Sequence, residues 1–215
     1  MIVLTPNPAH RFLGRDGSPS DEAVIRECWV ENVYQIHRGD LRDTGILIDI
    51  GANIGAVSIY AASLGATVIA YEPEPDNLAL LQQNIAGNGM AERVVVHAAA
   101  VTDWHGTAQL EPAHGNSRIV DYGSGITVPS ITLDDVFADL PDGCDVLKID
   151  IEGSERELIA AAAPETLARI RYLTMEFDAA PDDEFGAMVT KIAKVFNTHI
   201  IGSPERGGYI YGRRY

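Results

Sequence analysis

The chain has 215 residues, of which 46% are hydrophobic and 22% are charged, a composition ordinary for a globular protein. It carries 16 Lys and Arg residues against 31 Asp and Glu residues, which gives a formal net charge of −15. A surface of this charge repels phosphate backbones and anionic lipids, so neither duplex nucleic acid nor a membrane is expected as a general partner.

Two further features favour a cytoplasmic location. The only cysteines, Cys28 and Cys144, form no C-x-x-C pair, which is typical of a reducing compartment. The apolar start of the chain is interrupted at Pro6 and Pro8, and no run approaches the roughly 20 apolar residues that span a bilayer. We expect one domain over residues 1–215, and whether it forms a homo-oligomer stays open.

Residues 1–44 precede the predicted core. Ser20 and Asp21 begin a predicted helix that continues to Cys28. The segment is either a lid over a ligand site or a preamble whose aromatic residues pack on the sheet. Tyr34 is a candidate site residue under the first interpretation.

The stretch 46–60 predicts a strand, a tight turn and a helix. Its first five residues are apolar except Asp49, as in a strand buried on both faces of a parallel sheet. The next residues complete Asp-Ile-Gly-Ala-Asn-Ile-Gly at 49–55, and glycine there lets the backbone turn sharply and approach a ligand. This spacing fits the acidic-x-G-x-G-x-G pattern of S-adenosylmethionine-dependent methyltransferases, with Asn in place of the middle glycine. The predicted cofactor-binding residues of this turn are Asp49, Gly51, Ala52, Asn53 and Gly55.

Two alternatives to that interpretation of the turn remain. A dinucleotide fingerprint requires G-x-G-x-x-G, and Asn53 and Ala56 stand where its second and third glycines would be. An ordinary turn between a strand and a helix, with no cofactor, is the other alternative.

Glu72 stands at the end of the next predicted strand, Thr67 to Tyr71. A carboxylate at this position can accept two hydrogen bonds from a ribose diol. It supports a nucleoside cofactor without distinguishing S-adenosylmethionine from NAD. Alternatively, Glu72 only favours the start of the helix that follows Pro73.

A third strand is predicted from Arg93 to His97. The small residues after it, Ala99, Ala100 and Val101, are predicted to pack against adenine, although tight core packing would use the same residues. Residues 102–130 then predict a β-hairpin excursion on the substrate side.

His105 and His114 lie in that excursion. Neither has the partner spacing of a metal site, so both are expected to be solvated loop residues.

The remaining elements complete an α/β pattern. Thr132 to Leu140 is predicted as a helix, and Val146 to Ile149 and Tyr172 to Phe177 as the fourth and fifth strands. Two short strands, His199 to Ile201 and Tyr209 to Tyr211, are predicted to form a terminal hairpin. Such a hairpin is absent from many dinucleotide-binding folds.

Four sequence blocks together resemble the FkbM-type methyltransferases. They are the turn at 49–55, Tyr-Glu-Pro-Glu-Pro-Asp-Asn at 71–77, Asn-Ile at 84–85 and Leu-Lys-Ile-Asp-Ile-Glu-Gly-Ser-Glu at 147–155. The resemblance implies a class I methyltransferase fold, S-adenosylmethionine as the methyl donor and usually a hydroxyl oxygen as the acceptor. That fold is a Rossmann-like three-layer α/β sandwich, with a mostly parallel seven-stranded sheet in the order 3-2-1-4-5-7-6 and a C-terminal antiparallel hairpin.

Asp150 and Glu152 follow the fourth strand, and ligands of open α/β sheets bind beyond the carboxyl ends of strands. An alcohol becomes a better nucleophile as its proton leaves, so either carboxylate could act as the general base. Asp150 could instead orient the cofactor or the acceptor, and Glu152 could only favour the following helix. Lys148 lies on the same strand face as Asp150, and a pair between them would weaken Asp150 as a base.

A metal site is a further alternative, because Asp150, Glu152, Glu176 and Asp178 all lie at neighbouring strand ends. Together they could hold Mg²⁺ and polarise the hydroxyl. We predict no metal, since separate hydrogen-bonded or solvated acids explain the same residues and the resemblance requires none.

The sequence therefore predicts an S-adenosyl-L-methionine-dependent methyltransferase that O-methylates a hydroxyl of a small molecule or a glycan. An N-acceptor stays open. An NAD(P)-binding oxidoreductase and a methyltransferase-like module that binds without catalysis are the alternatives from other classes. Asn53, Ala56 and the terminal hairpin argue against the oxidoreductase.

Overall fold

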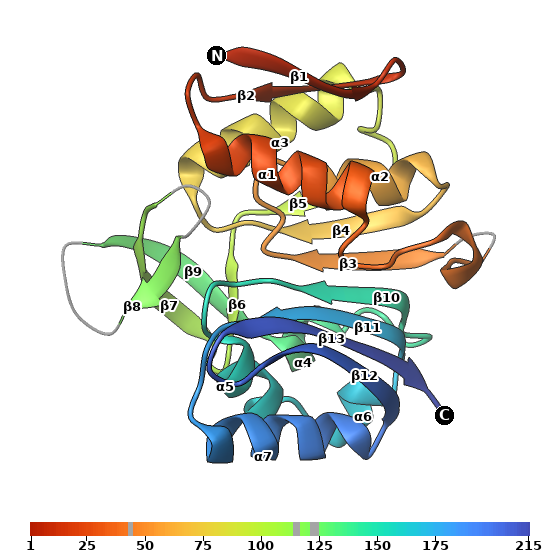
Figure 1. The fold of residues 1–215 in the computed structure, drawn as a ribbon, viewed down its shortest axis with the longest axis vertical. Coiled ribbons are helices and arrows are strands. Elements are labelled where there is room, and N and C mark those ends of the chain that lie inside the picture. The colour runs from red at the N-terminus through yellow and green to blue at the C-terminus, as the bar shows by residue number, and fades with distance from the viewer. Residues whose placement is uncertain (43–44, 114–116, 121–124) are drawn as a thin grey trace.

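A seven-stranded sheet forms the centre of the computed structural model, which describes residues 1–42, 45–113, 117–120 and 125–215 (Figure 1). Its strands are parallel except β13, which is antiparallel to both of its neighbours. The predicted order 3-2-1-4-5-7-6 and the C-terminal hairpin are therefore confirmed. In spatial order the strands are β5 (Val94–His97), β4 (Thr67–Tyr71), β3 (Ile46–Ile50), β10 (Cys144–Ile149), β11 (Ile170–Phe177), β13 (Gly207–Arg214) and β12 (Phe196–Ser203).

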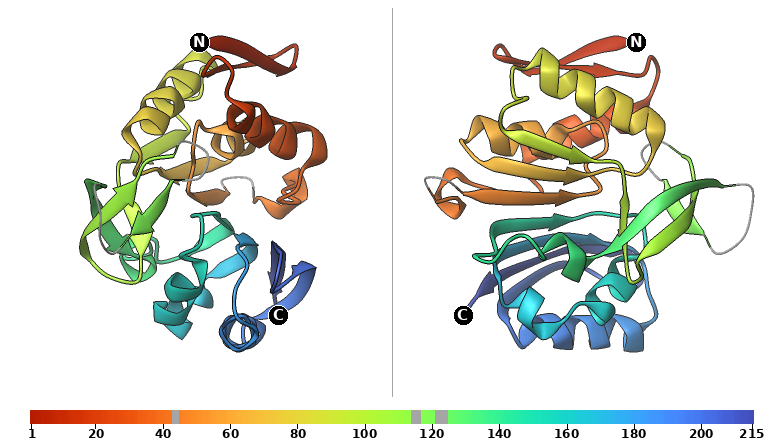
Figure 2. Two further views of the ribbon diagram at one scale, coloured as in Figure 1. Left: turned by 60° about the vertical axis from the view of Figure 1, so that its left-hand side comes forward. Right: turned by 180° about the vertical axis from the view of Figure 1, so that it is seen from behind.

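Helices cover both faces of this sheet, because its central strands are apolar on both sides. Leu47 and Val146 belong to the core on one face, and the next residues, Ile48 and Leu147, belong to the core on the other. All four are fully buried, and each contributes about 1.5–3 kcal/mol to the stability of the fold. Three layers result, as predicted (Figure 2). The helices are α1 (Pro19–Arg26), α2 (Ala56–Ser63) and α3 (Pro75–Gly87) on the first face, and α4 (Leu133–Val136), α5 (Glu155–Ala161), α6 (Pro164–Leu167) and α7 (Asp182–Ala193) on the second.

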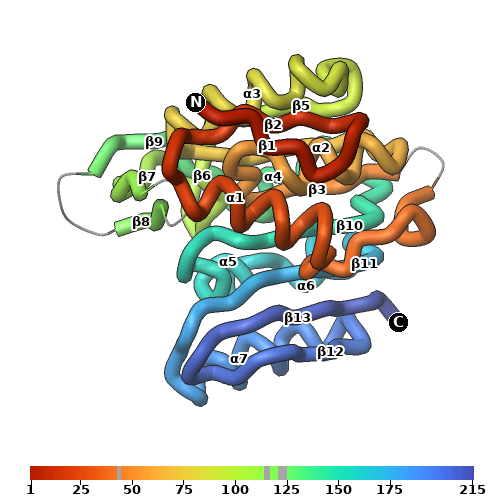
Figure 3. The backbone as a smooth tube through the Cα atoms, turned by 45° about the horizontal axis from the view of Figure 1, so that its top comes forward, coloured from red at the N-terminus to blue at the C-terminus, as the bar shows by residue number. Residues whose placement is uncertain are grey.

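An N-terminal hairpin, β1 (Ile2–Asn7) and β2 (His10–Gly14), replaces the short apolar start expected from the sequence. It lies beside α3 (Figure 3). The buried amide of Asn84 accepts the backbone N–H of Leu13 at 2.6 Å and donates to the carbonyls of Leu13 and Ile54 at 3.1 and 2.9 Å. This pairing spans 71 residues of chain, so local sequence patterns carry no signal for it.

The helix predicted from Ser20 to Cys28 is α1 followed by a π-helical turn, η1 (Glu27–Glu31). Asn32 ends that turn in a left-handed conformation, with φ at 48°. The chain then passes through η2 (Arg38–Asp40) before entering β3.

The excursion at 102–130 is larger than the predicted hairpin. It contributes to a second, four-stranded sheet in which β6, which begins at Ala100, pairs in parallel with β9. Ala100, Ala108, Leu110 and Val128 give this sheet a small core of its own, and burying them favours the extra strands over a lone hairpin. The strands are β6 (Ala100–Thr102), β7 (Gly106–Glu111), β8 (Arg118–Val120) and β9 (Ile126–Thr132).

Two other predicted boundaries were wrong. The helix expected from Thr132 to Leu140 is the single turn α4, although Thr132 and Asp135 do form a capping box at its start. The terminal hairpin is longer than predicted, since β12 and β13 have eight residues each. Pairing with β11 extends β13 beyond the short apolar run that signalled it.

No helix within the described residues is long and apolar enough to cross a membrane. Cys28 and Cys144 are both buried and unbridged.

Candidate functional site

A cavity of about 470 Å³ lies at the carboxyl ends of β3, β4, β10 and β11, within the size range of small-molecule and cofactor sites. The structure brings most of the predicted site residues together here. Those that line the cavity are Gly51, Asn53, Glu72, Ala99, Ala100, Val101, Asp150 and Glu152. Asp49, Ala52 and Gly55 are not in its wall.

The turn after β3 is shaped by close packing as well as by any ligand. Gly51 has φ at 78°, and a Cβ there would lie 1.8 Å from the backbone oxygen of Asp150. A Cβ at Gly55 would lie 2.6 Å from a methyl group of Leu81. Asn53 takes φ at 51° and accepts the N–H of Ile54 through its side chain. The glycine pattern thus reflects contacts within the protein.

Asp49 is fully buried beneath this turn. Its carboxylate accepts the Ser58 hydroxyl at 2.6 Å and lies 3.2 Å from Nζ of Lys148. That ammonium donates in turn to the carbonyl oxygens of Gly51 at 2.6 Å and Ile50 at 3.2 Å. Asp49 therefore acts on the cavity through the turn that Lys148 holds, and a direct contact with a cofactor stays a prediction.

Glu72 lies in the cavity wall with only 4% of its surface exposed. Its two carboxylate oxygens accept the backbone N–H groups of Asn53 at 2.7 Å and Glu74 at 2.8 Å. Burial raises the pKa of Glu72 to about 7, against the lowering effect of these hydrogen bonds. Each oxygen keeps a further lone pair, so the group can accept from a diol.

Carboxylates crowd the other end of the cavity, where Asp150, Glu152, Glu176 and Asp178 are joined by Glu27 of η1. Burial raises the pKa of Glu152 to about 8, with further contributions from the charges of Asp150, Asp178 and Glu176. Burial and Asp150 raise the pKa of Glu176 to about 8. At neutral pH both glutamic acids are substantially protonated.

The described residues include all four members of the alternative Mg²⁺ site. No group of three or more His, Cys, Asp or Glu side chains among the described residues is arranged to hold a metal ion. His105 lies outside the cavity and pairs with Asp135 at 3.0 Å on the surface, whereas His114 lies outside the described residues.

Asp150 has two neighbours beneath the cavity. Nζ of Lys148 lies 3.7 Å from its Oδ2 atom, as the strand register predicted. The Tyr34 hydroxyl donates to the same oxygen at 2.7 Å. Tyr34 is buried and is not in the cavity wall.

One wall of the cavity comes from α1 and η1, through Ser20, Ala23, Val24 and Glu27. The sequence left open a lid formed by residues 1–44, but none of these four residues was predicted to line a site. Their i, i+3, i+4, i+7 spacing places them on one helix face. Because two of the four residues are polar and two are apolar, they form no apolar stripe from which this face could have been predicted.

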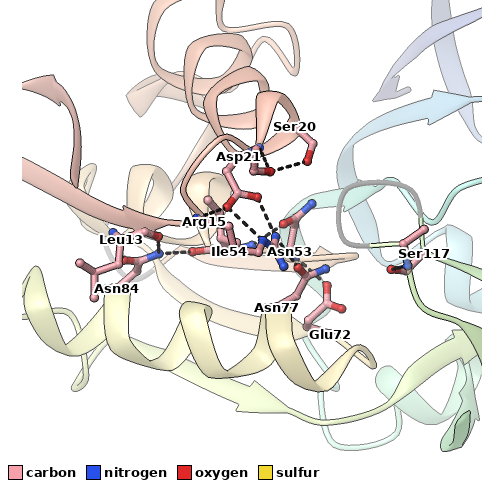
Figure 4. A network of polar contacts seen from close by, with 12 residues as sticks. Leu13, Arg15, Ser20, Asp21, Asn53, Ile54, Glu72, Asn77, Asn84 and Ser117 are labelled. Atoms are coloured by element: carbon pink, nitrogen blue, oxygen red, sulfur yellow. Dashed lines mark hydrogen bonds and ion pairs between the residues drawn. The ribbon is translucent and has the colours of Figure 1, made fainter. Parts of the chain in front are cut away.

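Polar contacts hold that helix in place. The Arg15 guanidinium bonds Asp21 at 2.6 Å and Asn77 of α3 at 2.9 Å. Figure 4 shows these contacts beside Asn53 and Glu72, with Ser117 facing them from the side of the second sheet. Contacts across 62 residues of chain, such as Arg15 to Asn77, leave no local sequence signal.

A family model described as the methyltransferase FkbM domain matches residues 49–211, more than two thirds of the chain. The chain belongs to the FkbM methyltransferase family. Its matched region contains every predicted cofactor-binding and catalytic residue, so the cavity lies within the FkbM domain except for the wall that α1 and η1 supply.

Curated proteins and a solved structure agree with this assignment. The FkbM-type chain is 27% identical to 31-O-demethyl-FK506 methyltransferase FkbM of Streptomyces tacrolimicus and 25% identical to methyltransferase sdnD of Sordaria araneosa, each time over 71% of this chain and 73% of the relative. An rRNA methylase structure from Streptococcus thermophilus has a TM-score of 0.54 at 11% identity, over 94% of this chain and 99% of that one. This structural likeness shows the fold of a class I methyltransferase.

Replacing Gly51 by Ala should destabilise the FkbM domain by more than about 3 kcal/mol, because the new methyl group collides with the Asp150 backbone. Gly89→Ala is the matched control. Gly89 also has positive φ, at 68°, but open space around it, so the expected cost is about 1–2 kcal/mol. Urea unfolding measures both, and equal losses would contradict the close approach.

The raised pKa values of Glu152 and Glu176 predict that stability falls as pH rises from about 5 to 8. The folded chain keeps protons there that the unfolded chain releases near pH 4.5. The melting temperature of the Glu152→Gln variant should therefore fall less than that of the wild type when the pH is raised from 5.5 to 8.5. Glu165→Gln is the control, because Glu165 is exposed. If the melting temperature of Glu152→Gln fell as much as that of the wild type, this result would count against the raised pKa of Glu152.

Proposed function

We propose that this protein transfers the methyl group of S-adenosylmethionine to a hydroxyl oxygen of a small molecule or a glycan. The observation that carries the proposal is the make-up of one cavity. A half suited to a nucleoside, with Glu72 and the small residues Ala99 to Val101, adjoins a half lined by Asp150 and Glu152.

The residues present fit the cofactor. Ala99, Ala100 and Val101 form an apolar wall of small side chains that leaves room for a flat base. The Glu72 carboxylate suits the ribose diol, and the turn at Gly51 and Asn53 brings backbone to the cavity for the methionine part. When bound, S-adenosylmethionine supplies a methyl group activated by a positively charged sulfur. A nicotinamide cofactor fits less well, since Asn53 and Ala56 replace two glycines of its fingerprint.

The protein's task in such a transfer is to hold the acceptor oxygen in line with the methyl group and to take its proton. The new carbon–oxygen bond forms as the carbon–sulfur bond breaks, and the hydroxyl proton passes to a carboxylate. Glu152, with a pKa of about 8, is largely protonated at neutral pH and cannot then accept the proton. Asp150 is therefore the base of the two candidates, although the Lys148 ammonium 3.7 Å from its Oδ2 atom makes it a weaker base than an unpaired carboxylate. Glu152 then donates a hydrogen bond that orients the acceptor.

The charge of the cavity restricts the class of acceptor that can bind. Glu27, Asp150 and Asp178 line the acidic end of the cavity, and their carboxylates would repel a phosphate or carboxylate group. A neutral or cationic acceptor with a free hydroxyl fits this environment. The name of the Streptomyces tacrolimicus relative describes methylation of an O-demethyl compound, which supports a hydroxyl acceptor here.

The buried, unbridged cysteines agree with a cytoplasmic location.

Thermal unfolding with S-adenosylmethionine, S-adenosylhomocysteine, NAD or NADP tests the cofactor. At 100 times the dissociation constant, a ligand stabilises the protein by about 2.7 kcal/mol, or roughly 5–10 °C for a chain of this size. Only the two sulfur nucleosides should produce this shift, and Glu72→Ala should abolish most of it. A shift with NAD alone would overturn the proposal.

The base assignment is tested with labelled S-adenosylmethionine and a panel of neutral, cationic and anionic alcohols. For an acceptor that the wild type methylates, Asp150→Asn should lower kcat by about 10²- to 10⁴-fold. Glu152→Gln should have a smaller effect, because the amide still donates a hydrogen bond. Wild-type rates retained in Asp150→Asn would remove it as the base, and cofactor binding without transfer to any alcohol would favour the non-catalytic module.

A further inference from the structure

Tyr34 lies in the segment between η1 and η2, outside the region that the FkbM family model matches. Its side chain is 6% exposed. The hydroxyl donates to Oδ2 of Asp150 at 2.7 Å, across 116 residues of chain. Burial, followed by the charge of Asp150, raises the pKa of this phenol well above its usual value, so Tyr34 remains a hydrogen-bond donor.

Both neighbours of Asp150 engage the same oxygen. Nζ of Lys148 lies 3.7 Å from Oδ2 and 5.4 Å from the centre of the Tyr34 ring. Across the described part of the chain, no hydrogen bond to the other oxygen, Oδ1, is formed. The Asp150 side chain is 21% exposed and lines the cavity. One oxygen is therefore fixed beneath the cavity, and the other is available to a ligand.

The position of Tyr34 is itself fixed. The Tyr172 hydroxyl donates to the Tyr34 carbonyl at 3.1 Å, and the Tyr209 ring packs edge-on against the Tyr34 ring with centroids 6.1 Å apart. Asn32 and Gln35, on either side, have φ at 48° and 51°. Left-handed backbone is costly for residues other than glycine and persists where surrounding contacts determine it. The hydroxyl thus reaches Asp150 from a rigid support.

We infer that Tyr34 is a positioning residue for methyl transfer: its hydroxyl, with Lys148, holds Oδ2 of Asp150 so that Oδ1 faces the acceptor hydroxyl. The inference rests on the proposed function. Displacement of a catalytic group by about 1 Å can lower a rate by about 10²-fold, and a carboxylate free to rotate about its side-chain bonds can move that far. The N-terminal segment would then contribute directly to the geometry of the reaction.

Tyr34→Phe removes the hydroxyl and keeps the ring. Tyr60→Phe is the matched control, because the Tyr60 hydroxyl also donates to this segment, to the carbonyl of Ile36 at 3.3 Å, without contacting Asp150. Crystal structures of both variants and the wild type with S-adenosylhomocysteine give the orientation of the Asp150 carboxylate. We expect it to be rotated or disordered in Tyr34→Phe alone. An unchanged carboxylate in Tyr34→Phe, or an equal change in Tyr60→Phe, would overturn the inference.

Kinetics supply a second readout with any alcohol that the wild type methylates. Tyr34→Phe should lower kcat at least 10-fold while KM for S-adenosylmethionine stays within 2-fold, and Tyr60→Phe should leave both within 2-fold. A parallel rise in KM would indicate a merely structural role and overturn the inference. Failure of the proposed function is seen separately, as a wild type that does not bind S-adenosylhomocysteine. Crystal structures without that ligand would then still show whether Tyr34→Phe alone changes the orientation of the Asp150 carboxylate.

Discussion

The buried ammonium of Lys148 is the interaction on which the site depends. Burial alone would lower the pKa of Lys148, but the charges of Asp49 and Asp150 outweigh it, and the net shift is upward. The ammonium lies between the carboxylates of Asp49 in β3 and Asp150 at the end of β10, and it also donates to the carbonyl oxygens of Ile50 and Gly51. Removing one partner of a buried ion pair typically costs about 3–5 kcal/mol. The position of the turn and that of the proposed base therefore depend on the same side chain.

Carboxylates beyond this ion pair give the cavity an excess of negative charge, which Glu152 and Glu176 reduce by keeping protons at neutral pH. A ligand with a positive sulfur would stabilise their ionised forms. Binding of such a ligand and release of protons are then linked. The crowding of carboxyl groups in the cavity, which is unfavourable without a ligand, thus favours a cationic ligand over a neutral nucleoside of the same shape.

Local sequence patterns predicted the sheet well, because β3, β4 and β10 are buried apolar strands whose ends carry the acids. Asp150 and Glu72 were placed correctly at one edge, since carboxyl ends of parallel strands meet there. The patterns failed where distant side chains decide the structure. Asn84 binding the N-terminal hairpin, and Tyr34 reaching Asp150, join residues 71 and 116 positions apart. No periodicity records such pairs, so the hairpin was missed, and the residues of the wall formed by α1 were not identified although a lid was left open as an interpretation.

The contact between Gly51 and the backbone of Asp150 bears on how this family can diverge. A glycine imposed by the packing of two strands is retained for as long as the sheet is retained, whether or not a ligand binds. A descendant that had abandoned catalysis would keep Gly51, and it would also keep Glu72 and Asp150, because the first accepts two backbone N–H groups and the second pairs with Lys148. Glu152 would be free to drift. Loss of Glu152, rather than loss of the glycine, would therefore mark a homologue that has become a binding protein.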